Sequence, residues 1–245
     1  MIIAPGQEDE ILQGILLGGE IELKGQFVLG NNYTFLVEVT RDQDSCQAVY
    51  KPCQGEQPLW DFPPDSLSRR EVAAYHVSQT LGWNLVPVTV LRETGPFGAG
   101  SLQRFIEHDP DYHYFNFSNE DRARLVPAAL FDLLINNADR KGGHILMDKD
   151  KKVWLIDHGL CFHEDEKLRT VIWDFAGTPI PVELLAGLKE FKSVLNESGE
   201  LYSLLADFIN PHELTALQVR CERLLAKGTF PIPPDDRRAF PFPPI

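Results

Sequence analysis

The sequence predicts an α+β protein of two unequal lobes, a smaller lobe of antiparallel strands with one helix and a larger, mainly helical lobe. Two observations support this. Short segments of alternating polar and apolar residues, separated by turn residues, recur before Ile106. From Ser118 onward, apolar residues recur at helical spacing instead. We therefore expect a strand lobe at residues 1–106 and a helical lobe at residues 107–245.

The strand lobe contains one clear helix signal. Ser66 or Ser68 can cap a helix that runs to about Leu81 and ends at Gly82, because glycine is common just after a helix end. The apolar segment 7–18 fits either a helix or a strand. Strands are expected at residues 20–24, 34–39, 47–51, 86–91 and 100–106.

The helical lobe begins at Ser118, where an acidic residue three places later is typical of a helix start. Helical spacing then continues to Asn137, and a polar turn follows at residues 137–143. Short strands are expected at residues 145–146 and 153–156, and helices at 179–195 and 200–225. Residues 230–245 hold too many prolines for regular structure.

Composition narrows the class of protein. The 245 residues, 43% of them hydrophobic, are compatible with one two-lobed domain or with two small domains. A net charge of −13 argues against broad binding to nucleic acid or to an anionic membrane. Neither a secretory signal nor a membrane span is evident, and the four cysteines are scattered without a metal-binding spacing. We expect a cytoplasmic protein with reduced thiols, no integral membrane association and no nucleic-acid partner.

The pattern that suggests chemistry lies in and after the polar turn. Asp139 and His144 stand in this turn, and the hairpin that follows ends in Asp157. Such a hairpin places residues 144 and 157 at the same end of the strand pair, facing Asp139. Phosphoryl transfer needs this grouping, because one carboxylate orients the attacking hydroxyl and two further ligands hold the metal that neutralises the phosphates. We expect Gly159 to let the backbone bend away after Asp157.

This stretch resembles the catalytic and metal-binding loops of the bacterial phosphatidylinositol 3-/4-kinase-like family within the protein-kinase-like superfamily. Members carry Asp-Arg, then Asn five residues after the aspartate, then Asp-x-Gly. Asp139-Arg140 matches the first pair, His144 stands at the fifth position, and Asp157-His158-Gly159 is similar to the last element.

The resemblance implies a two-lobed protein-kinase-like fold with ATP and Mg²⁺ or Mn²⁺ as cofactors. Lys51, in a segment similar to the lysine strand of the lipid 4-kinases, would contact the nucleotide phosphates. Glu71, in the next helix, would form an ion pair with Lys51. Asp139 would orient or deprotonate the acceptor, while His144 and Asp157 would bind the metal.

The resemblance also implies a set of nucleotide contacts outside these motifs. Gly30 lies in the hairpin that would cover the nucleotide. Gln103, Phe105 and Glu107 stand where the two lobes would join, a position that implies backbone hydrogen bonds to adenine.

Two departures from the family pattern affect the expected chemistry. His144 replaces the asparagine of the family, and a nitrogen ligand suits manganese better than magnesium. Lipid kinases need basic residues after Asp-x-Gly, but residues 163–169 include three acids. We therefore expect a phosphotransferase whose unknown acceptor is a protein or small molecule in preference to a phosphoinositide.

Other functions stay open at this point. The chain can be a nucleotide-binding pseudokinase, or a regulator that transfers AMP instead of phosphate. A metal-dependent hydrolase built on Asp139, His144, Asp157 and His158 is a further alternative, which makes no use of the N-terminal half of the pattern. The oligomeric state is open as well.

Overall fold

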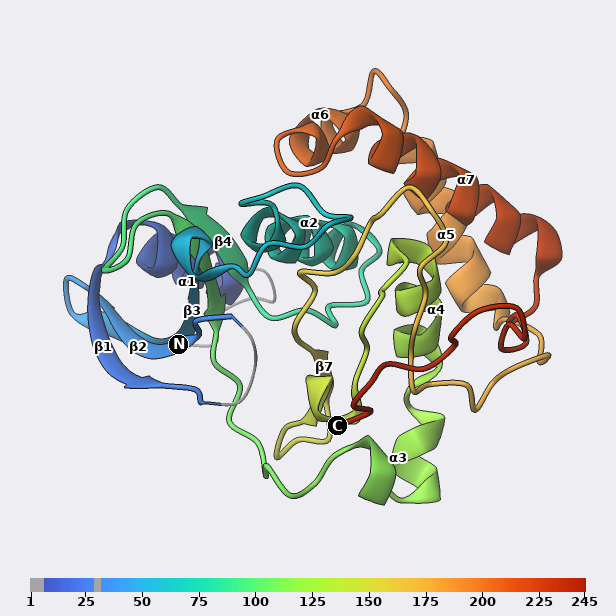
Figure 1. The fold of residues 1–245 in the computed structure, drawn as a ribbon, viewed down its shortest axis with the longest axis horizontal. Helices are drawn as coiled ribbons and strands as arrows, with labels where there is room; N and C mark the ends of the chain where they lie inside the picture. The colour runs from blue at the N-terminus through green and yellow to red at the C-terminus, as the bar shows by residue number, and fades with distance from the viewer. Residues whose placement is uncertain (1–6, 29–31) are drawn as a thin grey trace.

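The computed structural model describes residues 7–28 and 32–245, and it shows a sheet-based lobe beside a helical lobe (Figure 1). The first lobe is a five-stranded antiparallel sheet in the order β1-β2-β3-β5-β4. Its strands are β1 (Glu20–Gln26), β2 (Phe35–Arg41), β3 (Asp44–Pro52), β4 (Thr89–Arg92) and β5 (Gly100–Arg104). Its helices are α1 (Gln7–Gly18), which settles the open assignment of this segment, and α2 (Leu67–Thr80).

The helical lobe contains a two-stranded antiparallel hairpin and several helices. The hairpin consists of β6 (Ile145–Met147) and β7 (Val153–Leu155), as expected. The helices are α3 (Asn119–Ala123), α4 (Val126–Ile135), α5 (Val182–Val194), α6 (Glu200–Ala206) and α7 (Pro211–Lys227). The predicted α+β class, with an antiparallel lobe and a mainly helical lobe, is confirmed.

Strand β3 is positioned by its alternating burial. Ala48 and Tyr50 are fully buried on the core face of the sheet, and Val49 and Lys51 are partly exposed on the opposite face. The sheet register pairs Lys51 with Ser101 of β5. This alternation sets the direction in which Lys51 projects.

Helix α2 lies between the sheet and the helical lobe (Figure 1). It begins where expected, with Ser66 as the residue before its first turn, but the serine side chain does not cap it. The carboxylate of Glu56 accepts instead from the backbone N–H groups of Leu67 (3.2 Å) and Ser68 (2.9 Å). Gly82 ends the helix with a φ of +67°, as predicted.

The single helix expected over residues 118–137 is wrong, because the chain forms α3 and α4 instead. Ser118 caps α3 by accepting a 3.1 Å hydrogen bond from the backbone N–H of Asp121. Pro127 then lacks the N–H that a continuous helix needs and would clash with a carbonyl one turn earlier, so it stands in the first turn of a new helix.

The helix expected over residues 200–225 is also divided, for the same reason. Pro211 begins α7, and Asn210 caps it by accepting from the backbone N–H groups of His212 (2.9 Å) and Glu213 (3.0 Å). Strand β4 begins later than expected, at Thr89, since Pro87 cannot donate to the sheet.

A buried arginine joins helix α2 to the helical lobe. Arg70 is only 1% exposed, and it donates to the carboxylate of Glu213 on α7 (2.5 Å) and to the carbonyl oxygen of Cys161 (2.6 Å). Its guanidinium also lies over the ring of Phe62, 4.8 Å from the centroid. Breaking such a buried pair leaves an uncompensated charge, so this contact fixes α2 relative to the helical lobe.

The cysteines Cys46, Cys53, Cys161 and Cys221 are free thiols, as expected. Within residues 7–28 and 32–245, no helix combines the length and the apolar character that a membrane crossing requires.

Candidate active site

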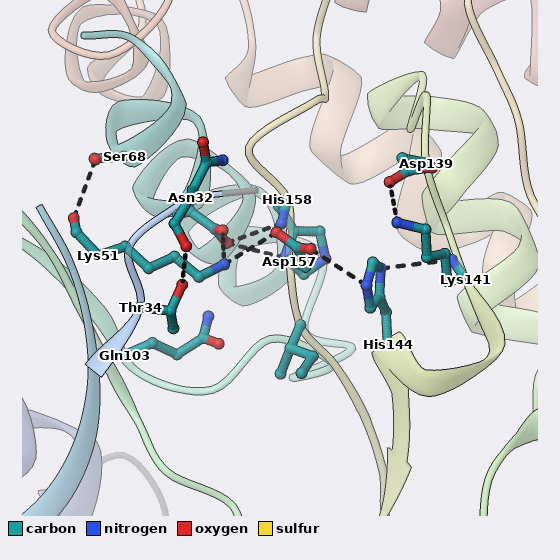
Figure 2. A network of polar contacts seen from close by, with 12 residues as sticks. Asn32, Thr34, Lys51, Ser68, Gln103, Asp139, Lys141, His144, Asp157 and His158 are labelled. Carbon is teal, nitrogen blue, oxygen red and sulfur yellow. Dashed lines mark hydrogen bonds and ion pairs between the residues drawn. The ribbon is translucent and has the colours of Figure 1, made fainter. Parts of the chain in front are cut away.

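Lys51 is the centre of a polar network between the two lobes (Figure 2). Its ammonium hydrogen-bonds to Glu71 of α2 and lies 3.0 Å from Oδ1 of Asp157. The lysine side chain is 23% exposed. Burial alone would lower the pKa of Lys51, but the carboxylates of Asp157 and Glu71 outweigh it and hold the pKa above its ordinary value. Lys51 is therefore a fixed positive charge at the opening of the site.

Glu71 connects Lys51 to the Asp-His-Gly segment. Its side chain is 3% exposed, and Oε2 accepts a 2.9 Å hydrogen bond from the backbone N–H of His158. Burial would raise the pKa of this carboxyl, but the charge of Lys51 and the hydrogen bond from His158 lower it. Glu71 therefore stays ionised and holds both partners in place.

Asp157 has an unusual backbone conformation, with a φ of +60°. Aspartate is among the few residues that enter this region at modest cost, and such conformations cluster at functional sites. We expected the backbone to bend at Gly159, and the chain does turn at Gly159 and Leu160, although the left-handed conformation is that of Asp157. A Cβ atom at Gly159 would lie 3.2 Å from Cβ of Leu67, so glycine serves the close approach of α2.

His144 lies directly beside Asp157, as the hairpin argument predicted. Its Nε2 is 3.2 Å from Oδ2 of Asp157, and both side chains lie within one network in Figure 2. Burial lowers the pKa of His144 to about 4, although Asp157 acts in the opposite direction. The imidazole is therefore neutral at pH 7, the form in which histidine binds metals.

This pair of side chains fits a divalent metal ion. Two ligands at right angles, each about 2.1 Å from a metal, stand about 3 Å apart, which is close to the spacing of His144 Nε2 and Asp157 Oδ2. Among residues 7–28 and 32–245, no cluster of three or more His, Cys, Asp or Glu side chains could hold a metal. The site thus resembles those in which two protein ligands leave the other positions to phosphate oxygens and water.

Asp139 stands on the loop before the hairpin, where Lys141 folds back onto it (Figure 2). The ammonium of Lys141 is 2.8 Å from Oδ2 of Asp139, whose side chain is 26% exposed. Burial raises the pKa of Asp139, Lys141 and Arg169 oppose this, and the charge of Asp157 adds to it. Sequence reasoning missed Lys141, although its place two residues after Asp139 in a short loop was a usable signal.

The buried side chain of Arg140 makes several contacts that hold the Asp139 loop. It is fully buried and pairs with the equally buried Asp132 of α4 at 3.0 Å. The same guanidinium donates to the carbonyl oxygens of Ile156 (2.6 Å) and His144 (3.3 Å), and it lies 2.8 Å from Nε2 of His158. Arg140 therefore ties the Asp139 loop to the backbone of His144 and to the two residues that flank Asp157. Asp132 was not predicted from the sequence.

The burial of His158 bears on the hydrolase alternative. His158 is fully buried and its Nε2 faces Arg140, so it is not available as a metal ligand or as a base for water. This packing argues against the hydrolase constellation and agrees with a structural role.

The three residues predicted to contact adenine differ in whether their polar groups already have hydrogen-bond partners. The side chain of Gln103 is buried and donates to Thr89 Oγ1 at 2.9 Å. The backbone N–H of Phe105 donates to the carbonyl oxygen of Gln47 at 2.9 Å and extends the sheet, so it is not free for a base. No described residue accepts from the backbone N–H of Glu107, which leaves it available.

Gly30 lies outside the described residues. Among the residues that follow it, Thr34 Oγ1 donates to the carbonyl oxygen of Asn32 at 3.4 Å (Figure 2). Asn32 Oδ1 accepts from the backbone N–H of Gln57 at 2.8 Å. These contacts connect the β1–β2 turn to the loop after β3.

Comparisons with known proteins show the family of this chain. Residues 36–207 match the model of the phosphatidylinositol 3- and 4-kinase family. The chain is 39% identical to Protein Rv2133c of Mycobacterium tuberculosis, with 97% of this chain and 96% of that protein covered. It is 32% identical to phosphatidylinositol 4-kinase gamma 4 of Arabidopsis thaliana over 46% of this chain and 25% of the plant protein.

Two kinases are among the solved structures with similar folds. The Golgi casein kinase with Mn/ADP bound gives a TM-score of 0.58 at 16% identity, over 91% of this chain and 76% of that one. The Helicobacter pylori proinflammatory kinase CtkA gives 0.52 at 13% identity, over 87% of this chain and 94% of that one. These likenesses concern the fold alone. The predicted family and fold are confirmed: the chain belongs to the phosphatidylinositol 3- and 4-kinase family and has a protein-kinase-like fold.

Proposed function

We propose that this protein binds ATP with Mg²⁺ or Mn²⁺ between its lobes and transfers the γ-phosphoryl group to a hydroxyl of a protein or small molecule. One observation carries the proposal. Lys51, Glu71, Asp157 and His144 come from β3, α2 and the β6–β7 hairpin, and they form one continuous set of contacts. The fold relative with Mn/ADP bound supports the same pair of cofactors.

The nucleotide phosphates would meet a fixed charge on the strand lobe. Lys51 remains protonated, and Glu71 and Asp157 hold it from two sides, so little side-chain order has to be gained on binding. The backbone N–H of Glu107, from which no described residue accepts, would be the adenine contact, since that of Phe105 is occupied by the sheet.

His144 and Asp157 would hold the divalent metal, which would neutralise phosphate charge during the transfer. Their spacing and the neutral imidazole support this role. A histidine nitrogen in place of an amide oxygen favours manganese over magnesium.

Asp139 would orient the acceptor hydroxyl and accept its proton. Its partial exposure allows an acceptor to reach the carboxylate. Lys141 sits on the same carboxylate, where it keeps Asp139 ionised and adds positive charge near the site of transfer.

A phosphoinositide headgroup fits this site poorly. After the Asp-His-Gly segment, Glu164, Asp165 and Glu166 are exposed. Lys167, which could bind a phosphate, is only 13% exposed and is paired with Asp61 at 2.8 Å. Arg169 is then the remaining cation of this segment. A single arginine supplies too little positive charge to bind a headgroup with several phosphates.

Single-turnover assays with labelled ATP test the proposal. With ATP, manganese and a pool of candidate acceptors, we expect label from the γ position in the product and none from the α position. Lys51→Met should abolish the transfer, and Lys149→Met, at an exposed residue of the hairpin turn, should not. Transfer from the α position alone would instead establish AMP transfer. Transfer to phosphoinositide vesicles but to no protein or small molecule would overturn the acceptor assignment.

The replacement of asparagine by His144 is the observation that favours a second candidate, a nucleotide-binding pseudokinase. In that case ATP and manganese bind tightly but neither label is transferred. The same assay, combined with a binding measurement, separates the two functions.

A further inference from the structure

The proline-rich segment near the end of the sequence crosses the helical lobe and reaches the β6–β7 hairpin (Figure 1). Residues 239–244 of this segment, here called the strap, contact the loop that carries Asp139. The carbonyl oxygen of Pro244 accepts a 2.8 Å hydrogen bond from the backbone N–H of Gly142. Gly142 lies between Asp139 and His144, in the middle of the candidate active site.

An aromatic ring also packs closely against Gly142. A Cβ atom at Gly142 would lie 2.7 Å from Cε2 of Phe115 and 3.5 Å from the carbonyl oxygen of Pro244. Glycine is therefore needed at this position, because a side chain would collide with Phe115. At Gly142 the loop thus contacts both Phe115 and the strap.

The strap also holds the segment that runs alongside the loop. The carbonyl oxygen of Ala239 accepts from the backbone N–H of Thr170 (3.1 Å) and from Nε1 of Trp173 (3.2 Å). Arg140 in turn exchanges backbone hydrogen bonds with its neighbours in this segment, donating to Arg169 (3.0 Å) and accepting from Val171 (3.2 Å).

The segment that precedes the strap is fixed at two points. At Phe230, backbone hydrogen bonds connect it to Gly177 (3.0 Å) and Thr178 (2.9 Å). At Arg237, the guanidinium lies 3.7 Å from the carboxylate of Glu166. Together with the contacts of Ala239 and Pro244, these contacts hold the proline-rich segment on the helical lobe at several points along its length.

We infer that the strap is a positioning segment for the phosphoryl-transfer site, which keeps the Asp139 loop in its productive geometry. The inference rests on the proposed function. The strap hydrogen-bonds to the backbone of the loop, while the side chain of Asp139 stays 26% exposed and is paired with Lys141. The strap thus holds the backbone of the loop and does not cover the side chain of Asp139 where an acceptor would bind.

Truncation after Arg238 tests this directly, with Ile232→Ala as the control. Ile232 is 73% exposed on the same proline-rich segment but lies outside the strap. Hydrogen exchange in the peptide that covers residues 139–144 should increase in the truncated protein and not in the control. This readout does not require the enzyme to turn over.

Binding and turnover should respond differently to the truncation. The calorimetric affinity for ATP with manganese should fall less than turnover, because Lys51 and Asp157 do not contact the strap, whereas His144 belongs to the loop that the strap holds. ATP turnover, with water as the acceptor, should fall by about tenfold or more, since small misplacements of a reacting group cost up to about 10²-fold. Trp173→Phe removes one strap hydrogen bond from the full chain and should cause a smaller effect in the same direction, should the truncated protein fail to fold.

Unchanged exchange and unchanged turnover in both variants would overturn the inference. A rise in turnover would also overturn it, because it would identify the strap as an inhibitory plug. A wild-type protein that binds no ATP with manganese would refute the proposed function instead, and the exchange measurement would still decide whether the strap holds the loop.

Discussion

Replacing Arg140 by methionine should strongly destabilise the protein. Arg140 and Asp132 are both fully buried and lie 3.0 Å apart. Removing the arginine leaves the carboxylate without its charge partner in a site that water does not reach. Losing one member of a buried pair typically costs about 3–5 kcal/mol, and neither side chain is exposed enough to relieve this cost by solvation.

The expected shift in melting temperature follows from the size of the chain. For domains of about 150–250 residues, 1 kcal/mol corresponds to about 2–4 °C in Tm, so Arg140→Met should lower Tm by about 6–20 °C. Thermal unfolding followed by circular dichroism at pH 7 measures this. Lys192→Met is the matched control, because its ion pair with Glu222 is about half exposed, with side chains 50% and 56% accessible, and should leave Tm almost unchanged.

A second substitution separates the lost charge from the lost packing. Adding Asp132→Asn to Arg140→Met removes the unpaired carboxylate, so the double variant should recover part of the lost Tm. Two results would contradict a stabilising role for the buried pair. In one, Arg140→Met lowers Tm no more than Lys192→Met does. In the other, the Tm decreases caused by Arg140→Met and by Asp132→Asn alone simply add in the double variant.

Further predictions concern the site itself. Glu71→Gln leaves Lys51 with one carboxylate partner and should weaken ATP–manganese affinity by about tenfold in calorimetry, as expected for the loss of a charge-assisted contact. Asp139→Asn should keep this affinity but lower turnover by about 10²–10⁴-fold, the usual contribution of a general base. Because Asp139 acts when ionised and Lys141 lowers its pKa, Lys141→Met should move the acid limb of the pH–rate profile to higher pH; a shift to lower pH would refute the assignment. His144→Asn should shift metal preference from manganese toward magnesium, measured as the ratio of turnover with each ion.

The chemistry-bearing residues could be predicted because they lie in short, ordered motifs. The hairpin between His144 and Asp157 placed these two residues near Asp139, and the resemblance to the phosphatidylinositol kinase family added Lys51 and Glu71. The structure places Lys51 against Glu71, as the resemblance implied, and His144 against Asp157, as the hairpin implied; the contact of Lys51 with Asp157 was not predicted.

The supporting contacts could not be predicted in the same way, because they join residues that are distant in sequence. Glu56 caps α2 in place of the expected serine from 11 and 12 residues away. Asp132 and Thr170 meet inside the protein, 38 residues apart, where Thr170 Oγ1 donates to the carboxylate at 3.0 Å. No local pattern marks such partners, since only tertiary packing brings them together.

The helix boundaries were a different kind of error. Pro127 and Pro211 are visible in the sequence, and each begins a new helix where helical spacing alone suggested continuity. Apolar periodicity continued across Pro211 because α6 and α7 both contribute buried leucines to the same core. The missing backbone donor of proline outweighed the periodicity.

Asp157 is proposed to bind the divalent metal through which this protein holds ATP. Isothermal titration of the wild-type chain with ATP and manganese, compared with Asp157→Ala and with Asp150→Ala, tests it most directly. Asp150 is an exposed aspartate in the turn of the same hairpin. We expect manganese-dependent binding in the wild type and in Asp150→Ala, and none in a folded Asp157→Ala. Equal affinity in all three proteins would contradict the account.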